Sequence, residues 1–177
     1  MATTKWVLDP THSEVEFKIK HLMISTVTGT FSSFSAEVET EGEDFTTAKT
    51  TFTIDVGSLN TKNEQRDGHV KSADFFDAAT YPQIKFVVTK IEDVDNDGSY
   101  DLHGDMTMHG VTKNIMLECE FGGVIKDPWG KTRAGLTISG KIHRKEFGLA
   151  WNAPTDAGGV VLGEDVKVHV ALEFVKG

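Results

Sequence analysis

Alternation of apolar and polar side chains at every second position is the feature that most constrains this chain. Val15, Phe17 and Ile19 alternate with charged neighbours, and residues 166–174 repeat the pattern near the C-terminus. Successive side chains of a β-strand point to opposite faces, so each run presents one apolar face to a core and one polar face to water. Helical periodicity is almost absent. The sequence therefore predicts an all-β protein.

The number and spacing of these runs indicate how the strands are arranged. Further runs cover residues 34–38, 52–56, 84–88, 100–102, 115–121 and 136–142. Turn signals lie at Asp97-Gly98, His109-Gly110, Gly122-Gly123, Asp127-Pro128 and Gly158-Gly159. Closure into a barrel removes exposed sheet edges, and an eight-stranded barrel can hold one small ligand. We expect an antiparallel up-and-down β-barrel of about eight strands, with a β-sandwich as the alternative.

One segment, from about Thr61 to Ala73, has helix signals. Thr61 could cap this helix, with Glu64 three residues later as in a capping box. The charged segment leads directly into Phe75 and Phe76, which gives it a polar and an aromatic face. We expect one short helix that caps the barrel.

Length, charge and the first residues limit the possible classes of protein. The 177 residues suit a single domain, residues 1–177, and no apolar run approaches the roughly 18 residues of a membrane span. The net charge of −9 argues against a nucleic-acid partner, which needs a basic surface. Residues 1–15 contain no apolar stretch typical of a secretory signal, so we expect a cytoplasmic protein, or a periplasmic one only if a leader was trimmed.

Histidine and acidic motifs do not predict a dedicated metal site or a cofactor. The seven histidines form no H-x-x-x-H or H-E-x-x-H pair. Asp93–Gly98 resembles the start of a calcium loop, but Gly104 stands where a bidentate Glu is needed. We expect a hairpin with an acidic tip there, with a weak cation site as the alternative. We also expect His12, His21 and His69 to face a barrel mouth.

Signals for catalysis are equally weak. The sequence has no G-x-S-x-G motif and no glycine-rich phosphate loop, and Ser13 is only a sequence neighbour of His12. Cys119 is the single cysteine, and its place in an alternating run predicts a small buried hydrophobe rather than a reactive thiol. We therefore expect a protein that is not an enzyme.

Several segments together resemble the YceI-like family of lipocalin-type barrels. The run from Trp6 to Met23 is similar to the family's first strand, and R-D-x-H-x-K-S-x-D-F-F-D with Y-P-x-I-x-F, from Arg66 to Phe86, resembles its central motif. Gly104–Lys113 is similar to G-D-L-T-x-x-G-V-T-K. His143–Gly148 is similar to N-R-x-D-F-G, with His143 for Asn and Glu146 for Asp.

The resemblance implies a lipocalin-like barrel that is often dimeric and holds polyprenyl phosphates, prenylquinones or other amphiphilic lipids in an apolar channel. Flexible and aromatic side chains suit such a channel. The side chains that we expect to line it are Phe17, Ile19, Phe34, Phe52, Ile54, Phe75, Phe76, Phe86, Met106, Met108, Leu117, Ile138, Phe147 and Trp151. Charge-assisted bonds to a lipid head group are expected from His21, Arg66, His69 and Lys71.

We interpret the protein as a non-catalytic carrier of a long-chain isoprenoid or similar lipid, with a homodimer as the candidate assembly. Two alternatives stay open at this point. One is an enzyme or stress-response factor acting on a lipid or quinone in the channel. The other is an interaction module whose core is filled by its own side chains.

Overall fold

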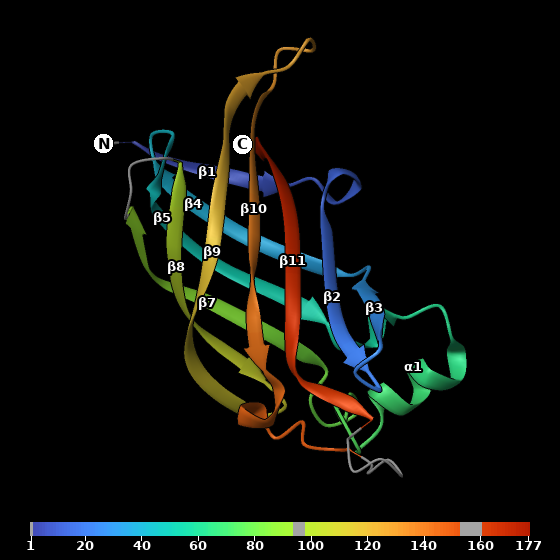
Figure 1. Ribbon diagram of the computed structural model, residues 1–177. Coiled ribbons are helices and arrows are strands. Elements are labelled where there is room, and N and C mark those ends of the chain that lie inside the picture. The colour runs from blue at the N-terminus through green and yellow to red at the C-terminus, as the bar shows by residue number, and fades with distance from the viewer. Residues whose placement is uncertain (1, 94–97, 153–160) are drawn as a thin grey trace.

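The computed structural model describes residues 2–93, 98–152 and 161–177 (Figure 1). Within these residues, eleven strands form one antiparallel sheet. Their bounds are β1 Thr3–Leu8, β2 Glu14–His21, β3 Ser25–Phe31, β4 Phe34–Glu41, β5 Asp44–Asp55, β6 Leu59–Asn60, β7 Gln83–Asp93, β8 Ser99–Met108, β9 Val111–Lys126, β10 Thr132–His143 and β11 Leu162–Lys176. The described helical segments are α1 Glu64–Lys71 and the 3-10 turns η1 Pro10–His12, η2 Val56–Ser58 and η3 Arg144–Phe147.

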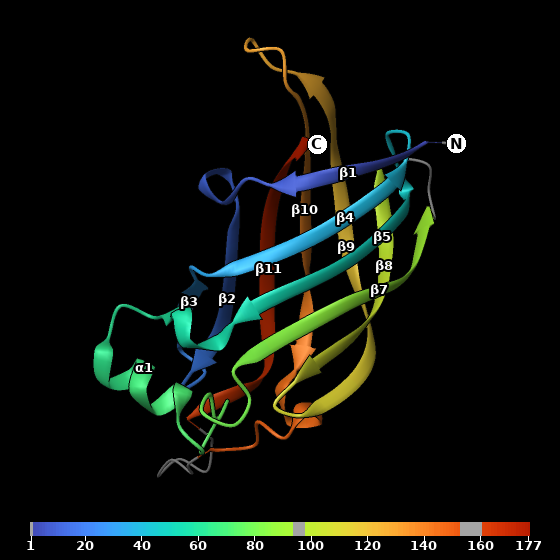
Figure 2. The same cartoon turned by 180° about the vertical axis from the view of Figure 1, so that it is seen from behind.

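Eight of these strands close into a ring, which confirms the predicted barrel. The order is β1-β4-β5-β7-β8-β9-β10-β11, and β11 pairs back with β1. One edge of β11 pairs with β10. The other edge pairs with two strands because β11 is 15 residues long: residues 174–176 pair with β1, and residues 162–171 pair with β2. β2, β3 and β6 therefore continue the wall beyond the ring. They end beside α1 at one end of the barrel (Figures 1 and 2).

The predicted alternation places the core inside the barrel. Along β8 every second residue is buried, including Leu102, Met106 and Met108. Gly104 occupies another buried position of the same strand, where a Cβ would come within 2.4 Å of the Phe86 ring. The absence of a side chain there makes room for that ring over the backbone. Gly29 makes room for an inward-facing ring from β2 in the same way.

The helix is shorter than predicted, and its cap is a different residue. Asn63 is the N-cap, and its side chain accepts a 3.0 Å hydrogen bond from the Arg66 N–H. The prediction of Thr61 as cap was wrong because Lys62, with φ of 65°, turns the chain between Thr61 and the helix. Thr61 instead donates its hydroxyl to the Asp67 carboxylate. No helix within the described ranges is long and apolar enough to cross a membrane.

The predicted turns have mixed outcomes. His109-Gly110 joins β8 to β9 with both residues at positive φ, and a turn at 127–130 joins β9 to β10, as expected. Gly122-Gly123 is not a turn, because both glycines lie inside β9, where the register with β10 shifts and Gly123 has φ of 110°. Residues 94–97 of the acidic hairpin and the Gly158-Gly159 signal lie outside the described residues.

Candidate functional site

A cavity of about 380 Å³ lies inside the barrel, within the roughly 300–1,000 Å³ of ligand pockets. Its wall is mainly apolar because period-2 alternation directs one face of each strand inward. It extends from Phe45, near the start of β5, to His69 in α1. Of the side chains expected for the channel, those that line it are Phe17, Ile19, Phe52, Ile54, Phe75, Phe76, Phe86, Met106, Met108, Leu117, Ile138 and Trp151.

The other two aromatic residues expected in the channel are not part of this lining. Phe34 packs against Phe52, with ring centroids 6.0 Å apart, and contributes to the partly buried shell of the core. Phe147 is fully buried in η3, where its carbonyl lies 3.1 Å from His109 Nδ1. Both side chains belong to the packed core around the cavity. The sequence pattern alone cannot distinguish their positions from those of cavity-lining residues.

The end of the cavity beside α1 carries polar side chains. His21, Arg66 and His69 line the cavity there, whereas Lys71 does not. Residues 66, 69 and 70 share one face of a helix by their spacing of three and four, and residue 71 falls on a different face. The helix therefore presents two of its three expected head-group residues to the cavity.

Arg66 is already committed to protein partners. Its Nε donates to Thr61 Oγ1 at 2.8 Å, and its Nη2 donates to the Thr61 carbonyl at 2.6 Å. The Thr61 N–H in turn donates to Asp67 Oδ1 at 2.9 Å. These bonds tie α1 to the chain that leaves β6, so Arg66 holds the helix against the barrel.

His69 belongs to an aromatic cluster at the same end. Its Nε2 lies 2.8 Å from Asp74 Oδ2, and its ring makes edge contacts with Phe75 and Trp151 at centroid distances of 5.2 and 4.9 Å. Phe75 also contacts Trp151 at 5.2 Å. The cluster joins α1, the segment after it and the segment after η3, and its three rings line the cavity at this end.

Arg144 is a lining residue that the sequence analysis did not select. It lies in η3, and its side chain is one of the few charged groups that is almost fully buried, with 2% exposure. Its position within His143–Gly148 is the one signal that could have identified it. An arginine that directly follows an alternating strand is usually exposed, so the pattern gave no indication of burial.

The expectation that His12, His21 and His69 face one mouth was wrong for His12. His12 ends η1 before β2 begins, whereas His21 is the last residue of β2. A strand of this length, at about 3.3 Å per residue, separates them by roughly 25 Å. The turn η1, which contains His12, therefore lies at the opposite end of the barrel from α1 (Figure 1).

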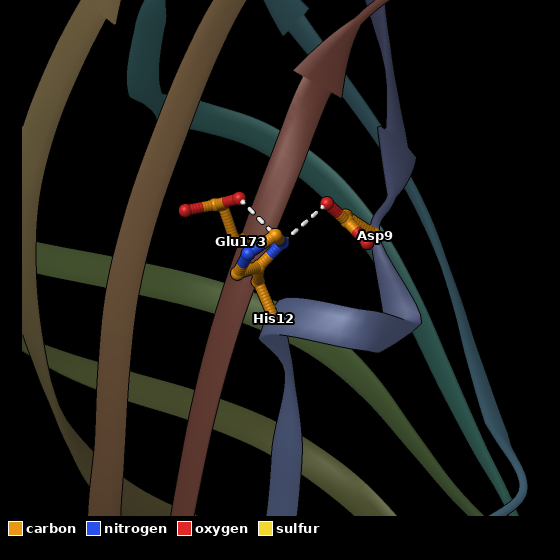
Figure 3. Close-up of side chains that lie close together, drawn as sticks. All are labelled: Asp9, His12 and Glu173. Atoms are coloured by element: carbon orange, nitrogen blue, oxygen red, sulfur yellow. Dashed lines mark hydrogen bonds and ion pairs between the residues drawn. The ribbon is translucent and has the colours of Figure 1, made fainter.

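His12 takes part in an ionic cluster that sequence spacing could not show (Figure 3). Its Nδ1 lies 2.8 Å from Asp9 Oδ2 and 3.5 Å from Glu173 Oε2. Potential ligand atoms of these three residues lie within 4.8 Å of one another, as in a metal site. However, Arg133 Nη1 is 2.9 Å from both carboxylates, and its Nε is 2.8 Å from Asp127 Oδ2. The guanidinium already occupies the position from which a cation would neutralise them.

The cluster shifts the pKa values of its members in opposite directions. Hydrogen bonds from Thr11 and His12, and then from Arg133, lower the pKa of Asp9. The hydrogen bond to Asp9, followed by the charges of Asp9 and Glu173, raises the pKa of His12 above its usual 6.5. The Arg133 hydrogen bond also lowers the pKa of Asp127. These shifts describe a network of ion pairs that ties η1, β10 and β11 together.

Cys119 also lines the cavity. Burial raises the pKa of its thiol to about 11, so the thiolate needed for nucleophilic chemistry is disfavoured. The residue behaves as the small hydrophobe that its alternating position predicts.

The family model of the YceI-like domain matches residues 6–174. The chain belongs to the YceI-like family. A UPF0312 protein of Staphylococcus aureus (strain USA300) is 41% identical over 172 residues, covering 97% of each chain. The sequence resemblance is thereby confirmed.

Solved structures with low sequence identity support the fold of this YceI-like chain. BcnA of Burkholderia cenocepacia superposes with a TM-score of 0.80 at 23% identity, covering 94% of this chain and 98% of that one. A polyisoprenoid binding domain from Saccharophagus degradans, implicated in plant cell wall breakdown, superposes with a TM-score of 0.71 at 18% identity, covering 97% and 98%.

Proposed function

We propose that this chain binds a long-chain isoprenoid or a similar amphiphilic lipid inside the barrel, and that it carries the lipid without transforming it. The mainly apolar cavity from Phe45 to His69 is the observation that carries the proposal. The structural similarity to the polyisoprenoid binding domain of Saccharophagus degradans supports the choice of ligand class. A polyprenyl phosphate and a prenylquinone both have the long apolar chain that such a wall accommodates.

Burial of the chain drives binding from water, because each buried CH₂ contributes about 0.8 kcal/mol. A bilayer offers the same chain a similarly apolar environment, so this contribution nearly cancels when the lipid comes from a membrane. Selectivity must then depend on contacts with the head group and on the fit of the chain. The polar residues at the α1 end of the cavity are the natural place for such contacts.

The two alternatives receive less support. A core filled by its own side chains would leave no cavity of about 380 Å³. An enzyme acting in the cavity would need an activated nucleophile or a pair of titratable groups facing the ligand. Cys119 has a raised pKa, and the carboxylate partner of His69 is on Asp74, which does not line the cavity.

Native mass spectrometry after gentle purification, followed by lipid extraction, tests the proposed function. Carriage predicts a bound mass that is released unchanged as an isoprenoid or related lipid. A bound product that is chemically altered from a supplied lipid would favour the enzyme. A protein that neither retains nor takes up any lipid would contradict the proposal.

Two neighbouring positions on β7 provide a matched pair of variants. Val88 lines the cavity, whereas Val87 is 42% exposed on the outer face. Val88→Trp should obstruct the cavity and reduce lipid uptake, while Val87→Trp should leave uptake unchanged. Equal uptake by both variants would show that the lipid binds somewhere other than the barrel interior.

A further inference from the structure

Arg144 is held in place by backbone carbonyls from two segments. Its Nε donates to the Gly163 carbonyl at 2.8 Å, and its Nη1 donates to the carbonyls of Leu149 and Trp151 at 2.5 and 2.8 Å. These acceptors carry no formal charge. The bonds therefore fix the guanidinium rigidly without neutralising it.

The third nitrogen of this guanidinium has no partner. Nη2 is buried and forms no hydrogen bond, the one such side-chain atom among the described residues. Glu164 is a nearby carboxylate whose charge acts on Arg144, but it pairs with Lys145 at 2.7 Å and with His143 at 3.7 Å. Burial lowers the pKa of Arg144, yet a guanidinium in a protein keeps its proton. A buried charge with an unsatisfied donor is costly, so the site is incomplete as it stands.

This guanidinium, with its unpaired nitrogen, lies in the wall of the cavity. Arg144 lines the cavity together with His21, Arg66 and His69, at the end beside α1. Two donors of that group are committed, since Arg66 holds Thr61 and His69 Nε2 pairs with Asp74. Glu16 is the one carboxylate residue of the described lining, and its carboxylate lies 3.5 Å from Lys18 Nζ. Nothing acidic in the described lining is therefore available to neutralise Arg144.

We propose that Arg144 Nη2 is the anchoring donor for an anionic oxygen, phosphate or carboxylate, on the head group of the bound lipid. This inference rests on the proposed function and specifies the chemistry of its ligand. Nη1 already donates to the carbonyls of Leu149 and Trp151. Arg144 therefore offers the head group the two hydrogens of Nη2, rather than one hydrogen from each of two nitrogens as in a bidentate contact. Because Nη2 is buried, the atoms that cover it must move when the head group reaches it. Arg66, in contrast, positions α1 and does not contact the head group.

Two probes with the same chain and different heads test the assignment: geranylgeranyl phosphate and the neutral alcohol geranylgeraniol. Dissociation constants are measured for the wild type, Arg144→Gln, and Arg66→Gln as a matched control at the same cavity end. We expect Arg144→Gln to weaken the phosphate by roughly 10- to 100-fold and to change the alcohol little, as for loss of a charge-assisted bond. Arg66→Gln should affect both probes equally. Arg144→Lys, which keeps the charge, should recover part of the preference for phosphate.

The outcomes separate this inference from the proposed function. If the wild type binds neither probe and no other lipid, the proposed function fails. If the wild type binds both probes and Arg144→Gln weakens them equally or not at all, the assignment of Arg144 is wrong while lipid carriage stands.

Because Arg144 also holds three carbonyls, its variants could fail to fold, which circular dichroism and thermal melting would reveal. A crystal structure of the wild type with geranylgeranyl phosphate would then decide. A phosphate oxygen within hydrogen-bonding distance of Nη2 supports the assignment. A water molecule on Nη2, with the phosphate elsewhere, overturns it.

Discussion

At the scale of single residues, Arg133 and Arg144 show two different uses of a guanidinium. Arg133 lies among three carboxylates, from Asp9, Asp127 and Glu173, and joins parts of the chain that are far apart in sequence. Arg144 is buried among carbonyls and keeps one free nitrogen. The first arrangement is satisfied within the protein and needs no ligand. The second is not, which is why we assign a binding role to Arg144 alone.

His12 should make the stability of the protein depend on pH. Because its pKa is raised in the folded state, the contribution of protonated His12 is fully present below the unfolded value of 6.5 and is lost as the pH rises through the folded value. Asp9 has a lowered pKa, so its contribution is lost only as the pH falls toward that lower value. His12→Asn should therefore lower the free energy of unfolding most between about pH 5 and 6.5, and least above the folded pKa of His12.

Chemical denaturation at several pH values measures this difference. His169→Asn is a suitable control, because His169 is exposed on β11. It should show little difference across the same range. A constant difference between His12→Asn and the wild type from pH 5 to 8 would contradict the assigned ion pairs.

Phe76 should contribute to binding through its apolar surface alone. It lines the cavity and contacts Phe31 edge-on, with centroids 6.3 Å apart. Phe76→Ala should weaken a neutral prenylquinone and a polyprenyl phosphate by similar factors, because both lose the same contact. The full loss for a buried ring is about 3–5 kcal/mol, and a ring that mainly touches ligand should lose less. A loss confined to one ligand would place Phe76 near the head group instead.

At the scale of elements, side-chain packing stabilises the strands, whereas hydrogen bonds at the N-terminal end stabilise the helix. α1 buries none of its residues, so its stability depends on the Asn63 cap and on the Arg66–Thr61 bonds. β3 and β8 carry Gly29 and Gly104, which accommodate aromatic rings from the neighbouring strands β2 and β7. The two kinds of element should therefore respond differently to substitution.

Removing the cap should loosen the helix locally. Asn63→Ala should cost the helix about 0.5–2 kcal/mol, and hydrogen exchange of amides 64–71 should accelerate while the global melting temperature changes little. Asn63→Asp, which can still accept the Arg66 N–H, should restore slow exchange. A large drop in global stability with Asn63→Ala would mean that α1 is integral to the barrel.

Adding a methyl group at Gly29 should instead disturb the core. The new Cβ would lie 2.2 Å from the Phe17 ring, which must then move. We expect a global loss of about 1–3 kcal/mol, as for overpacking, together with weaker lipid binding. Gly68→Ala in α1 is the control, because nothing lies within 4 Å of its added Cβ. Unchanged stability for Gly29→Ala would show that Phe17 has room to rotate away.

At the scale of the whole molecule, closure of the ring depends on β11 pairing with both β1 and β2. The Arg133 cluster holds the point where these strands meet, because it connects η1, β10 and β11. These ion pairs lie outside the cavity lining and hold the strands together at this end, whereas His69, Phe75 and Trp151 contact one another at the end beside α1. The aromatic contacts can separate without breaking strand pairing, so we expect lipid to enter at the end beside α1.

Chelators and reductants should leave the melting temperature unchanged. Arg133 already neutralises the Asp9 and Glu173 carboxylates, and Cys119 is free. Differential scanning fluorimetry with and without EDTA or dithiothreitol checks this expectation. A shift of several degrees with EDTA would indicate a bound cation, either at this cluster or at the acidic segment 93–98.

The sequence alone determined which residues face inward, because alternation is a local property of a strand and needs no knowledge of its neighbours. It therefore predicted the all-β class, the barrel and twelve of the side chains that line the cavity, including Phe52 and Leu117. Tertiary structure alone decided which strands meet and which distant residues touch. Arg133 reaches Asp9 across 124 positions, and Arg144 becomes buried only when the segments before and after residues 153–160 pack around it. Such contacts arise from chain closure, which local pattern does not encode.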